Sequence, residues 1–390
     1  MTPAARIAAA IDVLDLILVG GPAEKELTTW ARRNRYAGSG DRAAVRDLVF
    51  DALRCKRSYG WLGGGETGRA LMIGALRAQG QDLAQTFTGT AYAPPALAEG
   101  EVPDTQLQDA PNPIRLDMPD WLFPEMDQSL GADCEPVLQA LRQRASVFLR
   151  VNLAKTTLVT AQAALARDDI LTAPHPLSAT ALEVIANPRR IANSEAYQQG
   201  LVELQDAASQ AVVDRLPRAP RCLDYCAGGG GKSLALAAQP NVQVFAHDID
   251  PARMQDIPAR AARAGVEVTQ IDTQDLTAQG YDLVFCDAPC SGSGSWRRAP
   301  DAKWRLTADR LTDLCLRQSG ILDTAKALVA PGGTLAYATC SLLNCENSEK
   351  ISNFTSKNPE WTSTAEERFT PLDGGDGFYV AVLTRVKTEA

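Results

Sequence analysis

The spacing of apolar residues predicts a helical domain at the start of the chain. Ile7, Ile11, Leu14 and Leu18 recur at intervals of three and four residues, and acidic side chains stand between them. This period gives an amphipathic helix that packs on a core, and it differs from the uninterrupted apolar run of a signal peptide. Because no convincing strand pattern occurs in residues 1–80, we expect this segment to be helical.

Residues 81–135 have the composition of a connector. They hold seven prolines, and eleven acidic residues against a single arginine. Prolines interrupt regular structure and like charges extend a chain, so we predict a mostly irregular segment that lies on a neighbouring surface. The apolar run Trp121, Leu122 and Phe123 would anchor it there.

Residues 136–216 predict a small α+β subdomain. After an initial helix, we expect a strand at 147–151, a helix at 156–167, a strand at 181–185 and helical residues at 205–216. Short apolar runs rich in Val, Ile and Leu support the strands. The pattern indicates a β-α-β unit.

From residue 217 to residue 390 strands and helices alternate. We place strands at 221–226, 242–248, 267–271, 281–286, 334–339 and 378–384, and helices at 230–239, 251–264 and 308–329. Such alternation is typical of a parallel sheet with helices on its faces. The fold class of this part is therefore α/β.

The net charge of −8 is distributed unevenly along the chain. Residues 81–135 contribute −10 (eleven acidic residues, one arginine), so the rest of the chain carries +2. Residues 30–60 hold eight Arg and Lys against three Asp, a local charge of +5. A patch of this kind attracts RNA phosphates, but it is equally typical of a solvated helix face.

The cysteines and histidines limit the chemistry. Nine cysteines form no Cys-x-x-Cys pair, and the only histidines are His175 and His247. We therefore expect no metal site and no disulfide framework, and reduced thiols fit a cytoplasmic protein. No apolar stretch approaches the roughly 20 residues of a membrane span.

A glycine cluster follows the first strand of the α/β part. The segment Asp224–Lys232 is neither a nucleotide-binding Walker loop, which would need Gly at Cys226, nor a dinucleotide fingerprint, whose third Gly would fall at Ser233 or Leu234. A glycine turn with acidic residues at later strand ends suits a nucleoside cofactor without phosphates, such as S-adenosylmethionine. The alternative is that the glycines only permit tight packing. Asp248 and Asp272 at successive strand ends favour the ligand.

Two cysteines stand in short motifs at strand ends. Cys290 lies in Asp-Ala-Pro-Cys-Ser-Gly, and Cys340 lies in Ala-Thr-Cys-Ser. Thiols presented in this way predict covalent catalysis on an electron-poor substrate. Five of the cysteines that lack such a motif are expected to pack in the core, namely Cys222, Cys226, Cys286, Cys315 and Cys345.

Together these motifs resemble the RsmB-type (Sun-like) RNA cytosine-5 methyltransferases. The family's Asp-x-Cys-Ala-Ala-Pro-Gly-Gly-Lys is similar to Asp224–Lys232, where Gly228 and Gly229 replace Ala-Pro. The stretch after Cys290, the Glu346-Asn347 pair and the closing Asp-Gly-Phe-Tyr at 376–379 also match. Residues 1–80 look like the family's NusB-like helical RNA-binding domain.

The resemblance implies a Rossmann-like methyltransferase domain at 217–390, preceded by a small α+β RNA-binding subdomain and the all-α domain. It implies that Cys340 is the nucleophile, that Cys290 assists product release and that Asp287 binds the cytosine edge. It assigns S-adenosylmethionine to Cys226, Ala227, Gly228, Gly229, Gly230, Gly231, Lys232, Asp248, Asp272 and Asp287. It further suggests RNA contacts at Arg297, Arg298 and Lys303.

We therefore expect a monomeric enzyme that methylates carbon 5 of a cytosine in small-subunit ribosomal RNA. Transfer RNA is the main rival substrate. A non-catalytic RNA-binding assembly factor is the rival class of function, and two intact cysteine motifs argue against it. Methylation of a protein or a small molecule would leave the basic helical domain unexplained.

Overall fold

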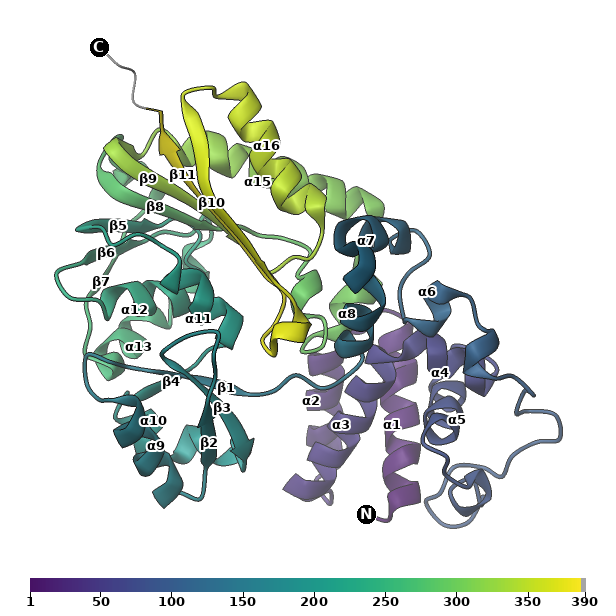
Figure 1. Ribbon diagram of the computed structural model, residues 1–390. Helices are drawn as coiled ribbons and strands as arrows, with labels where there is room; N and C mark the ends of the chain where they lie inside the picture. Colours follow the sequence, from purple (N-terminus) through teal and green to yellow (C-terminus); the bar gives the residue numbers. More distant parts are fainter. Residues whose placement is uncertain (387–390) are drawn as a thin grey trace. The chain divides into compact units, whose positions relative to one another are not determined.

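The computed structural model describes residues 1–386 and divides into two compact units. The helical unit comprises residues 1–144 and 296–306, and the α/β unit comprises 145–295 and the chain from 307 onward (Figure 1). The predicted α/β class is confirmed. None of the helices in residues 1–386 combines the length and the hydrophobicity that a membrane span requires.

The helical unit is built on five helices, which confirms that residues 1–80 are helical. They are α1 (Pro3–Leu18), α2 (Ala23–Arg33), α3 (Ser39–Arg54), α4 (Lys56–Gly63) and α5 (Gly68–Ala78). α1 packs on α2, α3 and α5 (Figure 1). The predicted apolar face of α1 buries Ile7, Val13 and Leu14 in one core with Val45 and Leu71. Burial of this face, rather than helix propensity, stabilises a helix of this length.

The acidic segment begins irregular, as its composition predicts. Between residues 81 and 110 only two short 3-10 helices form, η1 (Leu83–Gln85) and η2 (Leu107–Asp109). Two arginines of α5 bind the backbone carbonyls of this segment: Arg69 contacts Pro95, and Arg77 contacts Pro103 and Thr105. A backbone without regular structure needs such partners when it packs on a protein surface.

The second half of the acidic segment is more regular than predicted. It forms α6 (Asn112–Arg115), α7 (Phe123–Leu130) and, extending beyond its end, α8 (Cys134–Leu141). α6 and α7 carry proline in their first turn, where its missing N–H costs nothing. Prolines that predict irregular chain by composition therefore start helices here. Leu122 is fully buried, whereas Trp121 is 38% exposed.

One short segment of the α/β sequence belongs to the helical unit. Residues 296–306, with α14 (Pro300–Arg305), follow the Cys290 motif directly. The indole N–H of Trp304 donates to the carbonyl of Leu53 at 2.6 Å, and the Arg54 guanidinium donates to the carbonyl of Arg297 at 2.8 Å. These bonds fasten the segment to the end of α3.

A buried ionic cluster holds the same segment. The Lys303 ammonium, 3% exposed, donates to the carbonyl of Asp117 at 2.6 Å. The carboxylate of Asp117 is fully buried and pairs with Arg142 at 2.8 Å, and Ser58 donates to it through both its amide and its hydroxyl. Burial lowers the pKa of Lys303 to about 8 and raises the pKa of Asp117.

We expect Lys303→Ala to destabilise the protein. The substitution removes one of the two cations near the buried Asp117 carboxylate and takes a donor from the carbonyls of Arg54 and Asp117. Together these losses cost about 3 kcal/mol in the free energy of unfolding. Urea unfolding of the full chain measures the change.

Arg298→Ala is the matched control for Lys303→Ala. Arg298 is a basic residue of the same segment, but its side chain is exposed. Removal of an exposed cation typically changes stability by less than about 1 kcal/mol. Equal stabilities of the two variants would contradict the structural role of Lys303.

The α/β unit begins with a small antiparallel sheet in the order β2-β3-β1-β4. Its strands are β1 (Phe148–Val151), β2 (Leu171–Pro174), β3 (Ala181–Ala186) and β4 (Val202–Leu204), with helices α9 (Leu158–Arg167) and α10 (Glu195–Gln198). The two predicted strands are confirmed as β1 and β3. β2 and β4 were not predicted, because four and three residues give too little alternation.

The large sheet has seven strands in the order β10-β11-β9-β8-β5-β6-β7. They are β5 (Arg221–Asp224), β6 (Gln243–Ala246), β7 (Val268–Gln270), β8 (Tyr281–Asp287), β9 (Val329–Thr339), β10 (Trp361–Phe369) and β11 (Phe378–Arg385). All neighbours pair in parallel except β11, which is antiparallel to β9 and β10. All six predicted strands are present, and β10 is additional.

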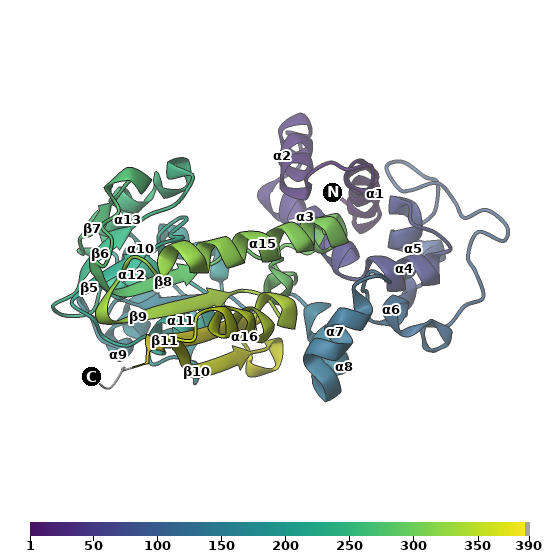
Figure 2. The ribbon, with the colours of Figure 1, turned by 90° about the horizontal axis from the view of Figure 1, so that it is seen from above.

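Helices cover both faces of this sheet (Figures 1 and 2). α11 (Ala207–Asp214), α12 (Gly231–Ala237) and α13 (Ile257–Ala264) cover one face, and α15 (Ala308–Ala325) and α16 (Ser348–Lys357) cover the other. Along β8, Leu283 and Phe285 join one core, while Val284 and Cys286 join the other. The predicted helix 251–264 is shorter, because a separate 3-10 turn precedes α13.

Candidate functional site

The predicted site residues collect at the carboxyl ends of adjacent parallel strands. Asp224 ends β5, Asp248 follows β6, Asp287 ends β8 and Cys340 follows β9. The strand order reverses around β5, which lies between β6 and β8. In open α/β sheets ligands bind at such a switch point, outside the carboxyl ends of the strands.

The two motif cysteines lie side by side. Parallel pairing of β8 with β9 sets Asp287 opposite Ala338, so the loops that follow both strands start at the same level. The sulfur atoms of Cys290 and Cys340 are 3.4 Å apart. The hydrogen bond with Cys340, followed by burial and the charge of Cys340, raises the pKa of the Cys290 thiol well above its ordinary value. The raised pKa therefore favours the protonated form of Cys290 in this pair.

A buried lysine supplies positive charge beside them. The Lys232 ammonium, on α12, donates to Oδ2 of Asp287 at 2.6 Å and lies 4.9 Å from the ring centre of Phe378. Burial alone would lower the pKa of Lys232, but the charge and hydrogen bond of Asp287, with a contribution from Cys340, raise it. Lys232 therefore remains a cation, and a neighbouring cation stabilises a thiolate.

The glycine loop is shaped around Asp248. Its backbone has positive φ at Gly228 (+51°) and Gly230 (+78°), a region that favours glycine. The amide of Gly228 donates to the Asp248 carboxylate at 3.0 Å, and a Cβ at Gly230 would lie 2.6 Å from Ile257. The glycine that replaces the family's alanine at position 228 thus suits the backbone conformation found there.

The carboxylates around this loop fit a cationic ligand. Asp224 is fully buried, and although Ser233 donates to one of its oxygens at 2.6 Å, no described residue binds the other. Burial raises the pKa of Asp224 to about 7. Asp248 and Asp287 stand at the neighbouring strand ends, while Asp272 is exposed beyond β7. An orphaned buried oxygen among acidic groups matches the positive charge of a sulfonium cofactor better than the negative charge of a phosphate.

Of the three basic residues after the Cys290 motif, two are buried and one is exposed. Lys303 and Arg297 are buried in the helical unit, where the Lys303 ammonium binds backbone carbonyls. Arg298 is exposed. Sequence reasoning detected their charge but had no signal for burial, since a lysine is rarely buried unless it is paired.

Several polar residues beneath the thiols were not predicted as site residues. Each motif cysteine is followed by a serine, and both serines bind the buried carboxylate of Glu346. Gln318 of α15 donates to the same carboxylate. In the sequence Glu346 stands out only as part of a motif match. The signal that could have revealed its role is the serine that follows each cysteine.

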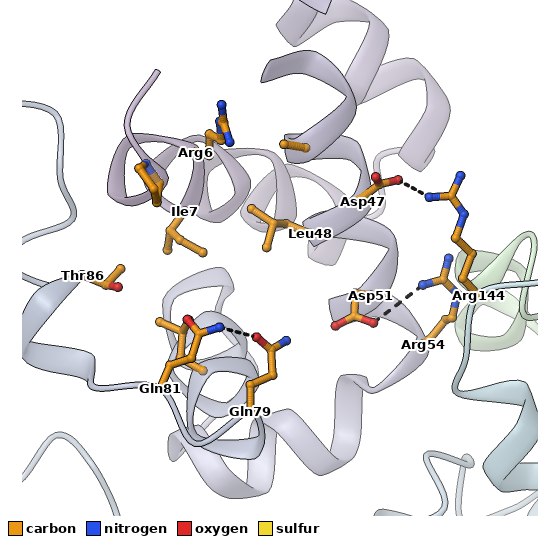
Figure 3. A pocket seen from close by; sticks show the side chains of 13 residues that line it. Arg6, Ile7, Asp47, Leu48, Asp51, Arg54, Gln79, Gln81, Thr86 and Arg144 are labelled. Carbon is orange, nitrogen blue, oxygen red and sulfur yellow. Dashed lines mark hydrogen bonds and ion pairs between the residues drawn. The ribbon is translucent and has the colours of Figure 1, made fainter. Parts of the chain in front are cut away.

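The helical unit contains a cavity of about 570 Å³. Figure 3 shows two pairs of charged side chains on its wall: Arg144 pairs with Asp47 at 3.0 Å, and Arg54 lies 3.8 Å from Asp51. These four charges therefore already have partners within the protein.

The fold and site define a Rossmann-like methyltransferase domain. Residues 215–384 match the family described as 16S rRNA methyltransferase RsmB/F, and residues 118–192 match the RsmF/B-like ferredoxin-like domain. The chain belongs to the RsmB/F methyltransferase family. The ferredoxin-like match starts within the acidic segment, where the sequence alone placed a connector.

The named relatives agree with this assignment, and solved structures share the fold. Ribosomal RNA small subunit methyltransferase B from Yersinia pseudotuberculosis (serotype O:1b) and from Yersinia pestis is 33% identical over 285 residues, covering 68% of this chain and 66% of the relative. The fold is similar to that of PH0851 (TM-score 0.77, 21% identity, 99% of both chains). It also resembles NSun6 from Pyrococcus horikoshii with SFG (TM-score 0.60, 16% identity, 70% of this chain and 99% of that chain).

We expect Gly294→Ala to disrupt the thiol pair. Gly294 donates to the carbonyl of Cys340 at 3.0 Å and accepts from the amide of Gly377 at 2.9 Å, and a Cβ there would collide with the backbone of Gly377. Activity should fall about 100-fold and stability by about 3 kcal/mol.

Gly320→Ala is the control for this substitution. Gly320 lies on the exposed side of α15, and a methyl group added there would meet no other part of the chain within 4 Å. Alanine should therefore stabilise the helix by roughly 0.5 to 1 kcal/mol. Methyl transfer and thermal unfolding, measured on both variants, separate the two effects. Wild-type activity in Gly294→Ala would show that the close backbone contact is dispensable.

Proposed function

We propose that the chain methylates carbon 5 of a cytosine in small-subunit ribosomal RNA, with S-adenosylmethionine as donor. The observation that carries the proposal is the thiol pair of Cys290 and Cys340, 3.4 Å apart, beside the ion pair of Lys232 and Asp287. A single nucleophile would need one cysteine. Two adjacent thiols suit a reaction in which one forms a covalent bond and the other helps to break it.

The proposed reaction begins with covalent activation of the base. The Cys340 thiolate forms a bond to carbon 6 of cytosine, and the displaced ring electrons make carbon 5 nucleophilic. Lys232 stabilises the thiolate, and Asp287 binds the ring edge as charge develops there. When bound, S-adenosylmethionine supplies an electrophilic methyl group to carbon 5. Loss of the carbon 5 proton then expels Cys340, and Cys290 assists this release.

The residues proposed to hold the cofactor are those of the glycine loop and the strand ends. They are Cys226 to Lys232 with Asp248, Asp272 and Asp287. The acidic character of this edge and the orphaned oxygen of Asp224 support a cationic ligand. NSun6, a solved structure with a similar fold, is described with SFG, an analogue of S-adenosylmethionine, which supports the same choice.

The ribosomal substrate is proposed from the named relatives. Their name specifies the small ribosomal subunit, and this chain spans 66% of their length. Transfer RNA remains the rival substrate, and a non-catalytic assembly factor the rival class. A complete thiol pair with a lysine beside it favours an enzyme, because an assembly factor has no use for that arrangement.

We propose that exposed arginines around the end of α2 and the start of α3 contact RNA. Of the eight cations in residues 30–60, four form ion pairs within the helical unit, namely Arg46, Arg54, Lys56 and Arg57. Among the described residues no ion pair involves the other four, which are all exposed: Arg32, Arg33, Arg35 and Arg42. The four cations in ion pairs fit the interpretation as a solvated helix face. The four exposed arginines are available to bind RNA phosphates.

Two aromatic residues flank three of these exposed arginines in the sequence, Trp30 before Arg32 and Tyr36 after Arg35. Trp30, Tyr36 and Tyr92 line an open pocket of about 840 Å³ in the helical unit, and Tyr36 is 75% exposed. Aromatic faces next to positive charges are the combination with which proteins bind single-stranded RNA. The pocket therefore supports RNA binding by the helical unit.

We expect the double substitution Arg33→Ala/Arg35→Ala to weaken RNA binding about tenfold. The slope of log affinity against log salt concentration should fall by about 2, because two phosphate contacts are lost. Filter binding with a fragment of small-subunit ribosomal RNA measures both quantities. Arg46→Ala is the control, since its guanidinium already pairs with Glu24. Equal effects of the two variants would argue against the proposed contact face.

We expect Cys290→Ala to accumulate a covalent complex with RNA. Without the thiol that assists release, Cys340 should stay bonded to carbon 6, and denaturing gels would show a slowly migrating protein–RNA band. Cys340→Ala and the double variant should give no such band. A band from Cys340→Ala but not from Cys290→Ala would reverse the assigned roles.

The cellular target can be read by bisulfite sequencing of RNA from cells with and without the gene. A single lost 5-methylcytosine in small-subunit ribosomal RNA is the expected result. A site lost from transfer RNA would select the rival substrate, and an unchanged methylation map would favour the assembly role.

A further inference from the structure

A buried carboxylate joins the two cysteine loops beneath the thiols. Glu346 lies at the end of the 3-10 helix η8 (Asn344–Glu346) and is fully buried. A buried charge is costly unless hydrogen bonds satisfy it, so its partners indicate what it does.

Four hydrogen bonds surround this carboxylate. Oε1 accepts from the amide of Ser291 at 2.8 Å and from the side chain of Gln318 at 3.0 Å, while Oε2 accepts from the hydroxyls of Ser291 and Ser341. An ionised carboxylate has about four acceptor sites, and all are used here. Since Ser291 follows Cys290 and Ser341 follows Cys340, one side chain binds both loops next to their thiols.

Other bonds make the pairing of the loops rigid. Gln318 also donates to the carbonyl of Pro289, directly before Cys290, at 3.0 Å. The amide of Leu342 donates to the hydroxyl of Ser293 at 2.8 Å, which ties the second loop to the first. The hydroxyl of Tyr337 donates to the carbonyl of Glu346 at 2.8 Å and holds the backbone of the carboxylate-bearing residue.

The charges around the two thiols differ in sign. Lys232 interacts with Cys340, which contributes to the raised pKa of that lysine. Glu346 is among the groups that raise the pKa of Cys290, after the hydrogen bond to Cys340, burial and the charge of Cys340. Two further ionisable groups lie nearby, Asp287, which pairs with Lys232, and Tyr337.

We propose that Glu346 is a positioning residue that binds both cysteine loops and thereby fixes the thiols of Cys290 and Cys340 in contact. Its charge also disfavours ionisation of Cys290, whereas the cation Lys232 interacts with Cys340. This rests on the proposed function, because the division of labour between the thiols matters for covalent catalysis on cytosine. Without such a bias either thiol could ionise, and only one is placed beside Lys232.

The pKa of Cys290 falls once Cys340 has reacted. A sulfur bonded to carbon 6 carries no negative charge and gives up its hydrogen bond with Cys290, so two of the causes that hold the Cys290 proton disappear. Cys290 can then lose its proton to solvent and accept the carbon 5 proton as Cys340 leaves. The proton balance closes, since the carbon 5 proton replaces the one that Cys290 released.

The test compares three substitutions in the full-length protein. Glu346→Gln removes the charge and keeps the shape, and Glu349→Gln removes an exposed charge three residues away as the matched control. Ser291→Ala/Ser341→Ala keeps the charge of Glu346 and removes two of its hydrogen bonds. This variant tests the positioning role if Glu346→Gln does not fold. Iodoacetamide labelling with peptide mass mapping gives the rate at each of the two cysteines, without RNA or cofactor.

In Glu346→Gln we expect the labelling rate of Cys290 relative to Cys340 to rise about tenfold. We also expect kcat for methyl transfer to fall about 100-fold with little change in KM for RNA. The serine variant should lower kcat while leaving the labelling ratio near that of the wild type. Glu349→Gln should match the wild type in both.

An unchanged labelling ratio in Glu346→Gln, or a kcat equal to the wild type, would overturn the proposal. A parallel change at both thiols together with a lower melting temperature would also overturn it, because it would show only a structural role. If the wild-type protein methylates no cytosine, the proposed function fails. The labelling ratio, which needs no substrate, still decides the role of Glu346.

Discussion

The parallel pairing of β8 with β9 is the contact on which the site depends. Its register brings the loops that follow β8 and β9 to the same end of the sheet. Each loop carries one of the two cysteines, which are 50 residues apart in the sequence. A slip of one residue would turn every side chain of a strand to the opposite face. The two cores on either side of β8 prevent such a slip, since Val284 and Phe285 must reach different helices. Core packing on both faces of β8, away from the thiols, therefore fixes the register that brings the two sulfur atoms close together.

Charge burial is the second constraint, and each unit uses it differently. In the α/β unit, buried charges surround reacting groups: Lys232 pairs with Asp287, and Asp224 keeps one oxygen without a partner among the described residues. In the helical unit, Asp117, Arg142 and Lys303 hold chain segments together. The paired charges of the helical unit fasten structure, whereas the Asp224 oxygen that lacks a partner is available to a ligand.

Much of the fold was predictable from the sequence, because long periodic segments reveal their structure. The apolar stripe of α1 and the alternation after residue 217 were confirmed, and the motifs placed Cys290 and Cys340 at strand ends. Three features could not be predicted from the sequence. β10 carries charged and polar residues along an edge strand, so it lacks an apolar pattern. Prolines at helix starts have the same local signature as prolines in loops. The burial of Lys303 had no signal, because its partner Asp117 lies 186 residues away.

Residues 296–306 belong to the helical unit although they lie between two segments of the α/β unit, and this limits how the protein can be divided into fragments. The backbone passes from one unit to the other after residue 144, after residue 295 and again after residue 306, so neither unit is a continuous stretch of chain. A fragment ending at residue 144 would lack α14 and would expose the ionic cluster to water. A fragment starting at residue 145 would carry eleven residues whose partners are missing. A gene encoding either unit alone would therefore encode an incomplete core, and domain exchange between relatives would have to replace two separate segments at once.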